Sequence, residues 1–354
     1  MAAYISFQPS DFYKTLLYTG TGAEHAVTGV GFQPDFSWIK CRNYGHSGNI
    51  YDSPRGATHY LVPSNNAIAV TDAQSLKSFD ADGFTLGTYT AVNDSTAGRE
   101  DFVAWNWKGG TTSGIATNGS TTITPSAYSF SQTAGISILK YTGTGSAGEK
   151  LAHGLGVTPT VIICKLVTPY TGDNWTSYHE PLTADKYMQL DTTAYQTDAL
   201  TRWNDTAPDS VNITLGSDSS INKSAATQIA YVFAPKKGFS KFGSYAGNGN
   251  VDGTFIYTGF RPAWILVKRY DSGSEDWNMW DDKRIGYNLT GNEKLYANLS
   301  SAESTADDEI DILSNGWKWR TTNGGLNASG GSYIYMAFAE FPFVSSNSKP
   351  GVAR

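Results

Sequence analysis

The apolar positions of this chain gather in a short pattern that occurs three times. In each copy a glycine precedes a proline by three residues, five strand-forming residues follow, and a lysine ends the run. Proline fixes φ and donates no backbone hydrogen bond, so it can precede a strand but not lie inside one. Each copy therefore predicts a β-strand just after its proline. The prolines and lysines that anchor the three copies are Pro34 and Lys40, Pro159 and Lys165, and Pro262 and Lys268.

The three predicted strands differ in which faces are apolar. The second and third copies are apolar on both faces, which predicts strands buried on both sides. The first copy places Asp35 and Ser37 on one face, which predicts a strand nearer to solvent.

Four further landmarks accompany each copy in a constant order. A Tyr-x-Gly-x-Gly turn precedes the proline strand, and a short β-type segment follows it. An asparagine comes nine or ten residues after the start of that segment, and an apolar run ends the copy. The turns begin at Tyr18, Tyr141 and Tyr245, and the asparagines are Asn93, Asn222 and Asn327. A repeated series of this length indicates three divergent copies of one unit of about 100 residues.

The predicted fold is all-β, with three tandem β-sandwich or jelly-roll-like units. Strand-like segments are short, bounded by glycine and asparagine, and recur at roughly 8–12-residue spacing, which is typical of such folds. The Asn118-Gly119 pair lies between alternating segments and predicts a β-hairpin in the linker. The predicted parts are an N-terminal arm (1–16), unit 1 (17–110), the hairpin linker (111–135), unit 2 (136–238), unit 3 (239–343) and a C-terminal tail (344–354).

Composition narrows the class of protein. Charged residues make up only 16% of the chain, against about 25% in typical globular proteins, and aromatic residues reach 13%. This profile favours a β-rich extracellular or virion protein over a helical cytosolic enzyme. The net charge of −6 argues against nucleic-acid binding, which needs a basic face. We expect no membrane insertion, since no apolar run approaches the length of a transmembrane helix, and no secretory signal at the N-terminus.

Candidate catalytic or metal chemistry is sparse. The two cysteines, Cys41 and Cys164, are predicted to be free thiols, and the five histidines lack metal-ligand spacing. Asp307, Asp308 and Glu309 with Asp311 could pair carboxylates for glycoside cleavage, but a solvated acidic loop is the favoured interpretation. We expect no metal, no cofactor and no enzymatic activity.

Aromatic residues are the candidates for ligand binding. Trp175 and Tyr178 follow the lysine of unit 2, and Trp277 and Trp280 follow that of unit 3. Exposed aromatic faces stack on sugar rings, so these four residues form a candidate glycan-binding patch. The alternative, that they pack in the core, is favoured because repeated tryptophans usually report packing.

The landmarks resemble a recurrent β-domain of tailed bacteriophages, especially marine and cyanobacterial phages. The resemblance rests on residues 141–145 leading to 153–159, on 241–249, on 257–264 and on 327–333. It implies a virion structural protein that is assembled in the host cytoplasm and acts outside the cell. The expected role is a tail fibre or tail-associated adhesin, a homotrimer that contacts other virion proteins and host-surface polysaccharide. A capsid decoration or head-fibre protein is the first alternative, and a polysaccharide depolymerase the second.

Overall fold

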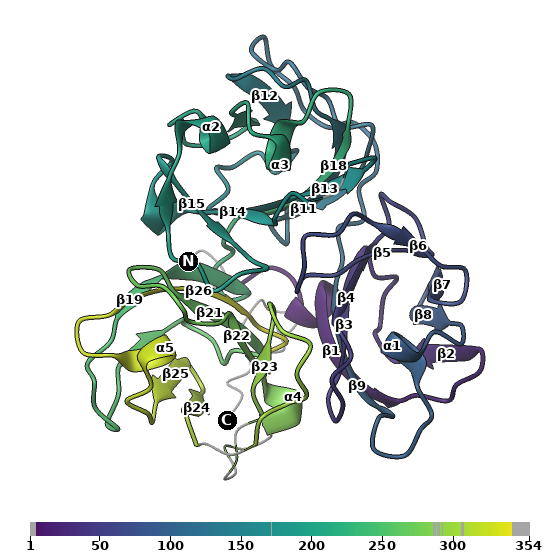
Figure 1. The fold of residues 1–354 in the computed structure, drawn as a ribbon, viewed down its shortest axis with the longest axis vertical. Helices are drawn as coiled ribbons and strands as arrows, with labels where there is room; N and C mark the ends of the chain where they lie inside the picture. The colour runs from purple at the N-terminus through teal and green to yellow at the C-terminus, as the bar shows by residue number, and fades with distance from the viewer. Residues whose placement is uncertain are drawn as a thin grey trace.

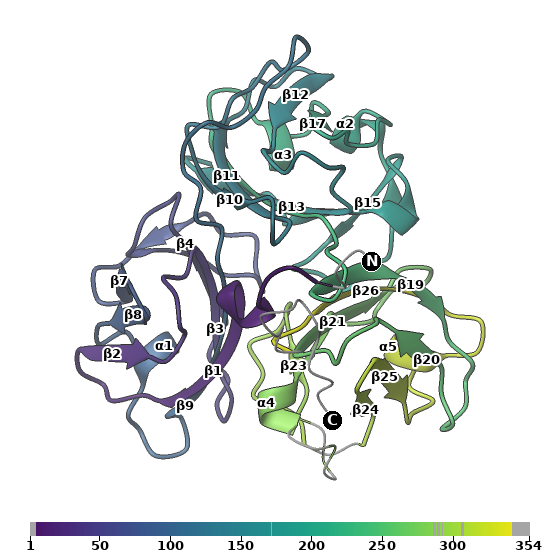
Figure 2. The same cartoon turned by 180° about the vertical axis from the view of Figure 1, so that it is seen from behind.

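The structure, a computed structural model, describes residues 5–170, 172–285, 288, 291, 293–305 and 308–341. Three β-units are arranged around a common centre (Figure 1), and the view from behind shows the same three lobes (Figure 2). The chain is thus all-β, with three sandwich-like units in tandem. The predicted C-terminal tail, the first four residues of the predicted arm and Asp307 lie outside the described residues.

Unit 1 pairs a six-stranded sheet with a three-stranded one. The large sheet has the order β1-β9-β3-β4-β5-β6 and the small sheet β2-β8-β7. The elements are η1 (Pro9–Asp11), β1 (Tyr13–Thr19), β2 (His25–Thr28), β3 (Phe36–Cys41), β4 (Asn49–Asp52), β5 (His59–Leu61), β6 (Val70–Thr71), β7 (Leu76–Asp80), β8 (Gly83–Leu86), α1 (Thr90–Asn93) and β9 (Asp101–Trp107).

Unit 2 repeats the strand order of the large sheet with one additional edge strand, and its small sheet has two strands instead of three. Its large sheet has the order β10-β11-β18-β13-β14-β15-β16, and β12 pairs with β17. The elements are β10 (Ala127–Ser131), β11 (Ile136–Thr142), β12 (Glu149–Ala152), β13 (Val161–Thr168), β14 (Thr176–His179), η2 (Glu180–Leu182), β15 (Lys186–Gln189), β16 (Thr197–Asp198), α2 (Leu200–Trp203), β17 (Asn212–Leu215), α3 (Ser219–Asn222) and β18 (Thr227–Phe233).

Unit 3 has the same central order of strands. Its large sheet is β19-β26-β21-β22-β23 and its small sheet β20-β25-β24. The elements are β19 (Ser240–Ala246), β20 (Phe255–Tyr257), β21 (Trp264–Arg269), β22 (Asn278–Asp281), α4 (Asp282–Ile285), β23 (Leu295–Tyr296), β24 (Ile310–Leu313), β25 (Gly316–Trp319), α5 (Gly324–Asn327) and β26 (Ser332–Phe338).

The proline strands begin where the sequence predicts. β3, β13 and β21 each start two residues after the repeated proline and end at the repeated lysine or shortly beyond it. The expectation that the first copy lies nearer to solvent is wrong, because every residue of β3 is buried. Its polar residues are satisfied inside the protein. Ser37 Oγ donates to Asn106 Oδ1 at 2.7 Å, and Asp35 accepts from Ser53 Oγ at 2.6 Å and from the Gly109 N–H at 2.9 Å.

The hairpin expected at Asn118-Gly119 does not form. Residues 112–126 contain no strand, and the edge strand of the linker comes later, as β10 paired with β11. The backbone N–H groups of Thr122 and Ile123 instead donate to the carbonyl of Lys150. The linker thus bonds to the small sheet of unit 2, and within itself it forms a turn at Asn118 and one antiparallel bridge between Thr111 and Phe130 instead of a hairpin ladder.

The repeated tyrosine and asparagine form one internal lock in each unit. The tyrosine hydroxyl donates to the carbonyl of the residue before the asparagine, at 2.6–2.7 Å in all three units. The asparagine amide donates across to the turn, and its side-chain oxygen accepts the N–H that follows the first glycine. A Cβ on that glycine would lie 2.2–2.4 Å from a backbone oxygen, so the turn requires glycine there. The Tyr-x-Gly-x-Gly motif is therefore structural.

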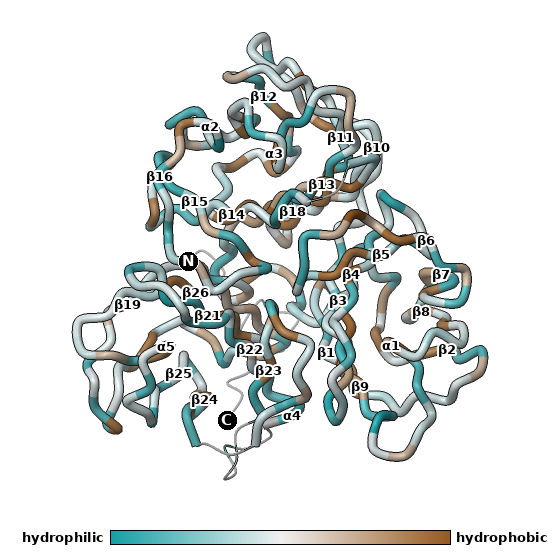
Figure 3. The backbone as a smooth tube through the Cα atoms, viewed as in Figure 1, coloured by the Kyte–Doolittle hydropathy of each residue, from teal (hydrophilic) through white to brown (hydrophobic). Residues whose placement is uncertain are grey.

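Apolar side chains form one core at the centre of the molecule and another inside each sandwich. The central core joins large-sheet residues of all three units, while the other clusters lie between the two sheets of a single unit. In Figure 3, brown segments follow the strands of the large sheets and the peripheral loops are mostly teal or pale. Each large sheet is thus covered on both faces, which explains the apolar runs in its central strands.

Candidate functional site: the junctions between the units

The three repeated lysines join the units in a closed ring. Each is buried, with an exposed fraction of 0–1%, and each reaches a backbone carbonyl of a neighbouring unit. The inter-unit bonds run from Lys40 to Leu299 at 2.8 Å, from Lys165 to Asn66 at 3.0 Å and from Lys268 to Thr193 at 3.2 Å. Unit 1 thus holds unit 3, unit 2 holds unit 1, and unit 3 holds unit 2.

Burial lowers the pKa of all three lysines from 10.5 to about 8. Desolvation disfavours the charged amine, whereas hydrogen bonds to carbonyl oxygens favour it. The lysines therefore stay protonated at neutral pH and act as buried donors.

A backbone hydrogen bond accompanies each lysine contact. Two residues after the lysine, a carbonyl accepts the N–H of the neighbouring unit. The three donor–acceptor pairs are Ala69 to Val167 at 3.1 Å, Gln196 to Tyr270 at 3.1 Å and Glu303 to Arg42 at 2.7 Å. Ala69, Gln196 and Glu303 thus occupy equivalent positions, as do Val167, Tyr270 and Arg42.

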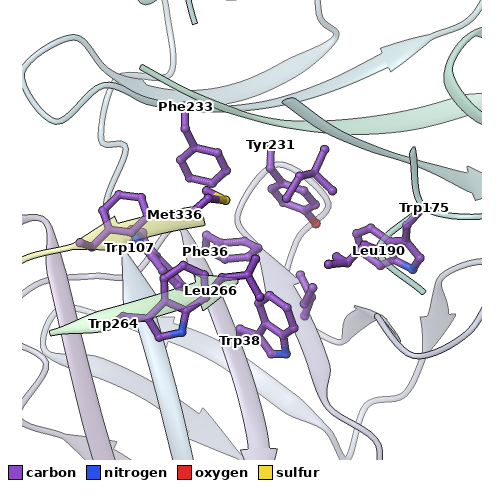
Figure 4. A pocket seen from close by; sticks show the side chains of 13 residues that line it. Phe36, Trp38, Trp107, Trp175, Leu190, Tyr231, Phe233, Trp264, Leu266 and Met336 are labelled. Carbon is purple, nitrogen blue, oxygen red and sulfur yellow. The ribbon is translucent and has the colours of Figure 1, made fainter. Parts of the chain in front are cut away.

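The centre of the ring is apolar. Figure 4 shows aromatic and aliphatic side chains from all three large sheets converging there, among them Trp38, Trp264, Tyr231 and Phe233. They leave a gap of about 20 Å³. A buried water needs two to four polar partners, so this gap stays dry.

None of the four aromatic residues proposed as a glycan patch offers an exposed face, since their exposed fractions are 0–3%. Trp175 Nε1 donates to the carbonyls of Val62 and Asn65 in unit 1, at 3.1 and 3.2 Å, and Trp277 Nε1 donates to that of Gln189 in unit 2, at 2.9 Å.

The other two members of the set lie on the opposite side of their strands. Tyr178 packs on Trp203 and Trp280 on Trp319, inside the sandwich cores of units 2 and 3. The glycan hypothesis for these residues is therefore set aside, because the first pair builds the junctions between units and the second pair fills the sandwiches.

Behind the lysines, the same position in the three junctions carries three different side-chain sets. Between units 3 and 1, Asp281 binds Arg284 Nε at 2.7 Å and accepts from Trp105 Nε1 at 3.0 Å. Between units 1 and 2, Asp52 binds Arg55 Nε at 2.6 Å and accepts from the Tyr231 hydroxyl at 2.7 Å.

The third junction, between units 2 and 3, carries His179 and Leu182 at the corresponding places in strand β14 and helix η2. Burial lowers the pKa of His179 to about 3, so the imidazole is neutral. Met336 of β26 occupies the strand position of Trp105 and Tyr231.

Sequence reasoning identified the lysines but missed these charged groups. A signal was present, because Asp52-x-x-Arg55 and Asp281-x-x-Arg284 recur 12 and 13 residues after the repeated lysine. The absence of the pair from the second copy hid it.

The acidic stretch near residue 308 is paired within the described residues. Glu309 binds Lys294 at 2.7 Å and Asp311 binds Arg320 at 2.6 Å, so neither offers a free carboxylate for glycoside cleavage. Among the residues that the structure describes, no three His, Cys, Asp or Glu side chains come together as metal ligands. None of the described helices is long and apolar enough to span a bilayer.

Comparison with known proteins identifies a family to which the chain belongs. Neither the curated proteins nor the solved structures contain a match. A family model matches residues 8–342, which span the three units and the linker between the first two. On that coverage, the chain belongs to the family described as a domain of unknown function (DUF7483).

Proposed function

We propose that the protein is a non-enzymatic structural component of a tailed-phage virion, a tail fibre or tail-associated adhesin that contributes to attachment to host-surface glycans. The observation that carries the proposal is the closed ring of junctions, which makes three sandwich units one body. A virion part that contacts a host must keep its shape outside the cell. The sequence resemblance to phage tail-fibre-like proteins supports the same role.

The closed ring of three units is relevant to the homotrimer expected for a tail fibre, because one chain already has an approximate threefold arrangement. The central core and the three lysine contacts already arrange three related units about one centre within a single chain. A threefold partner in a virion could therefore be met by one copy of this chain or by three.

Exposed tyrosines on the loops replace the buried tryptophans as candidate sugar-stacking groups. Tyr44 and Tyr170 lie four and five residues after their repeated lysines and are 39% and 47% exposed. A cation covers one face of each ring, with Arg99 4.1 Å from the centroid of Tyr44 and Lys223 4.4 Å from that of Tyr170. A ring fixed in this way can present its edge or other face to a sugar.

The location is tested by cryo-electron microscopy of virions that carry this protein. Density at the tail is the expected result. Density on the capsid lattice would replace the adhesin role by that of a decoration protein, and absence from purified virions would contradict the proposal altogether.

Glycan attachment is tested by binding purified protein to host cells. The double variant Tyr44→Ala/Tyr170→Ala should bind more weakly. Tyr257→Ala removes a more exposed ring (56%) that also has a cation, Lys241, over it, but it lies on the small sheet of unit 3 and not beside a repeated lysine, so binding should not change. Equal binding by both variants would remove the tyrosines from the site. Release of sugar fragments from host polysaccharide by the wild-type protein would favour the depolymerase alternative.

A further inference from the structure

A cavity of about 220 Å³ lies between units 1 and 2, at one junction of the ring. Arg55, His59, Ala69 and Thr71 line it from unit 1, and Lys140, Val167, Thr168 and Thr227 from unit 2. Its described lining contains an arginine, a lysine, a histidine and three threonines, with no carboxylate. The Thr71 hydroxyl is bonded to His59 Nδ1 at 2.9 Å. Thr71 and Thr168 are exposed, so the cavity reaches solvent.

The cavity exists because two long side chains of the matching junction are replaced by short ones. Between units 3 and 1, Arg42 and Glu303 form a bidentate ion pair, with contacts of 2.9 and 3.1 Å. The equivalent positions between units 1 and 2 hold Val167 and Ala69, as the matching backbone hydrogen bonds show. Both of these residues line the cavity.

The buried arginine behind the cavity loses a partner through this replacement. Arg284 Nη1 donates to the Glu293 carbonyl at 2.7 Å and to Glu303 Oε2 at 3.2 Å. In Arg55, Nε and Nη2 are bound to Asp52, the Ile50 carbonyl and the Tyr231 hydroxyl. Its Nη1 is buried without a partner, in a residue that is 7% exposed.

Arg284 also has one unpaired nitrogen, Nη2, but its guanidinium faces the Trp105 ring, with Cζ 5.7 Å from the centroid. An unpaired buried donor costs free energy. The unpaired donor of Arg55 is Nη1, and the matching Nη1 of Arg284 in unit 3 binds the Glu303 carboxylate.

The junction between units 1 and 2 also has fewer carboxylates to balance its cations than the junction between units 3 and 1. Between units 3 and 1, two arginines face Asp281 and Glu303, with Glu293 3.6 Å from Arg42. Between units 1 and 2, Asp52 binds Arg55 and accepts from Tyr231, and the described lining of the cavity gives Lys140 no carboxylate. Arg55, His59 and Lys140 line the same cavity, and the pKa of His59 is lowered by burial and then by the two cations.

We infer that this cavity is a binding site for a small oxyanion, a carboxylate or sulfate group, that takes the place of the Glu303 carboxylate beside Arg55 and Lys140. The anion lies beside the positive charge of Arg55 and accepts from the hydroxyls of Thr168 and Thr227, and Lys140 replaces Arg42 as the second cation. Charge-assisted hydrogen bonds of this kind are among the strongest in proteins. The group is either a free ion or the acidic substituent of a sugar.

The experiment measures the melting temperature of the whole protein in millimolar sodium sulfate and sodium acetate against sodium chloride of equal ionic strength. Calorimetry with glucuronate, and with glucose as the neutral control, separates an acidic sugar from a free ion. We expect sulfate or acetate to raise the melting temperature, and glucuronate to bind while glucose does not. Binding by the inorganic ions but not by glucuronate would assign the site to free ions.

Three variants test whether the anion that raises the melting temperature binds in the cavity. Ala69→Glu supplies the missing carboxylate from the chain, so it should raise the melting temperature without added anion and abolish the response to sulfate. Ala69→Gln fills similar volume without charge and should not stabilise. Lys140→Gln should weaken anion binding roughly tenfold, as expected for loss of one charge-assisted contact.

The reciprocal variant, Glu303→Ala, opens the equivalent space beside Arg284 and should gain stabilisation by acetate or sulfate. Equal melting temperatures of the wild-type protein in sulfate, acetate and chloride, with no heat on adding glucuronate, would overturn the inference. So would an undiminished sulfate response in Ala69→Glu, which would place the anion elsewhere.

Discussion

The junction between units 3 and 1 and the junction between units 2 and 3 solve one packing problem in opposite ways. The first buries Asp281, Arg284 and Glu303 as a hydrogen-bonded network. The second fills the same place with a neutral histidine, Leu182 and Met336. The lysine contact and the backbone bond beside it are kept in both.

The comparison shows which contacts occur in both junctions and which occur in only one of them. The lysine and the backbone bond use only carbonyl and N–H groups on the neighbouring unit, so they tolerate sequence divergence. The acid–arginine pair behind them is optional, because replacing a buried ion pair by packed apolar residues is often neutral or stabilising. Removing one member of an existing pair is a different matter, since it leaves a buried charge without compensation.

The largest expected effect comes from breaking the charged junction at its acid. Asp281→Asn removes the carboxylate that binds the fully buried Arg284 at 2.7 Å and leaves the longer contact to Glu303, at 3.2 Å. The free energy of unfolding should fall by about 3–5 kcal/mol. Urea denaturation at pH 7 measures it. Asp271→Asn removes the partner of Arg269 in a partly exposed pair, with side chains 19% and 31% exposed, and should cost less than about 1 kcal/mol. Equal losses in the two variants would contradict the comparison.

The neutral junction should instead be weak in acid. The folded-state pKa of His179, about 3, lies below the unfolded value of about 6.5, so the unfolded chain binds the proton first. Stability is therefore lost as pH falls from about 6.5 towards 3, by roughly 3 kcal/mol at pH 4.

His179→Leu should abolish this part of the acid dependence. Urea denaturation of variant and wild type at pH 7 and pH 4 isolates the histidine, because other titrating groups contribute to both proteins. A constant difference between the two proteins across this range would show that His179 does not titrate on unfolding.

Features that depend on residues close together in the sequence could be predicted, whereas contacts between the units could not. The strand after each proline depends on neighbouring residues, so the three units and their all-β class could be predicted. The acceptors of the lysines are backbone carbonyls of another unit, which no side chain marks. The same limit applies to Trp175 and Trp277, whose pattern identified aromatic residues but not the unit that covers them.

The first repeat shows a second limit. Asp35 and Ser37 suggested a solvent-facing strand, yet Asn106, Ser53 and the Gly109 N–H satisfy them in the interior. A polar residue is expected to face solvent only where the fold gives it no hydrogen-bond partner in the interior. Two of the partners of Asp35 and Ser37 come from distant segments of unit 1, which the local pattern does not show.

The lysine ring should make the protein more stable in mild alkali. The folded-state pKa of about 8 lies below the unfolded value of 10.5, so the unfolded state binds more protons between these limits. Stability should therefore rise with pH from about 8 to 10, by roughly 2 kcal/mol for each lysine. Above about 10 the buried tyrosines, whose pKa values are raised by burial, reverse the trend.

Lys268→Met should remove one third of that rise, and Lys77→Met, which deletes a surface lysine, should leave it intact. Denaturant titrations at pH 7.5 and 9.5 measure the difference. An unchanged slope in Lys268→Met would mean that the buried amine does not lose its proton in this range.

The smallest effect is expected where the junction between units 1 and 2 keeps one polar contact that its neutral counterpart lacks. Tyr231→Phe removes the hydroxyl that donates to Asp52 at 2.7 Å but leaves the ring in the central core. Asp52 keeps Arg55 Nε and the Arg55 N–H, so the free energy of unfolding should fall by only about 1–2 kcal/mol. Because Met336 holds the same place without any hydrogen bond, Met336→Leu should cost no more than a volume-conserving apolar exchange, about 1 kcal/mol. A loss in Tyr231→Phe as large as that in Asp281→Asn would mean that the hydroxyl, and not Arg55, is the main partner of Asp52 in the interior, and that the two charged junctions are not alike.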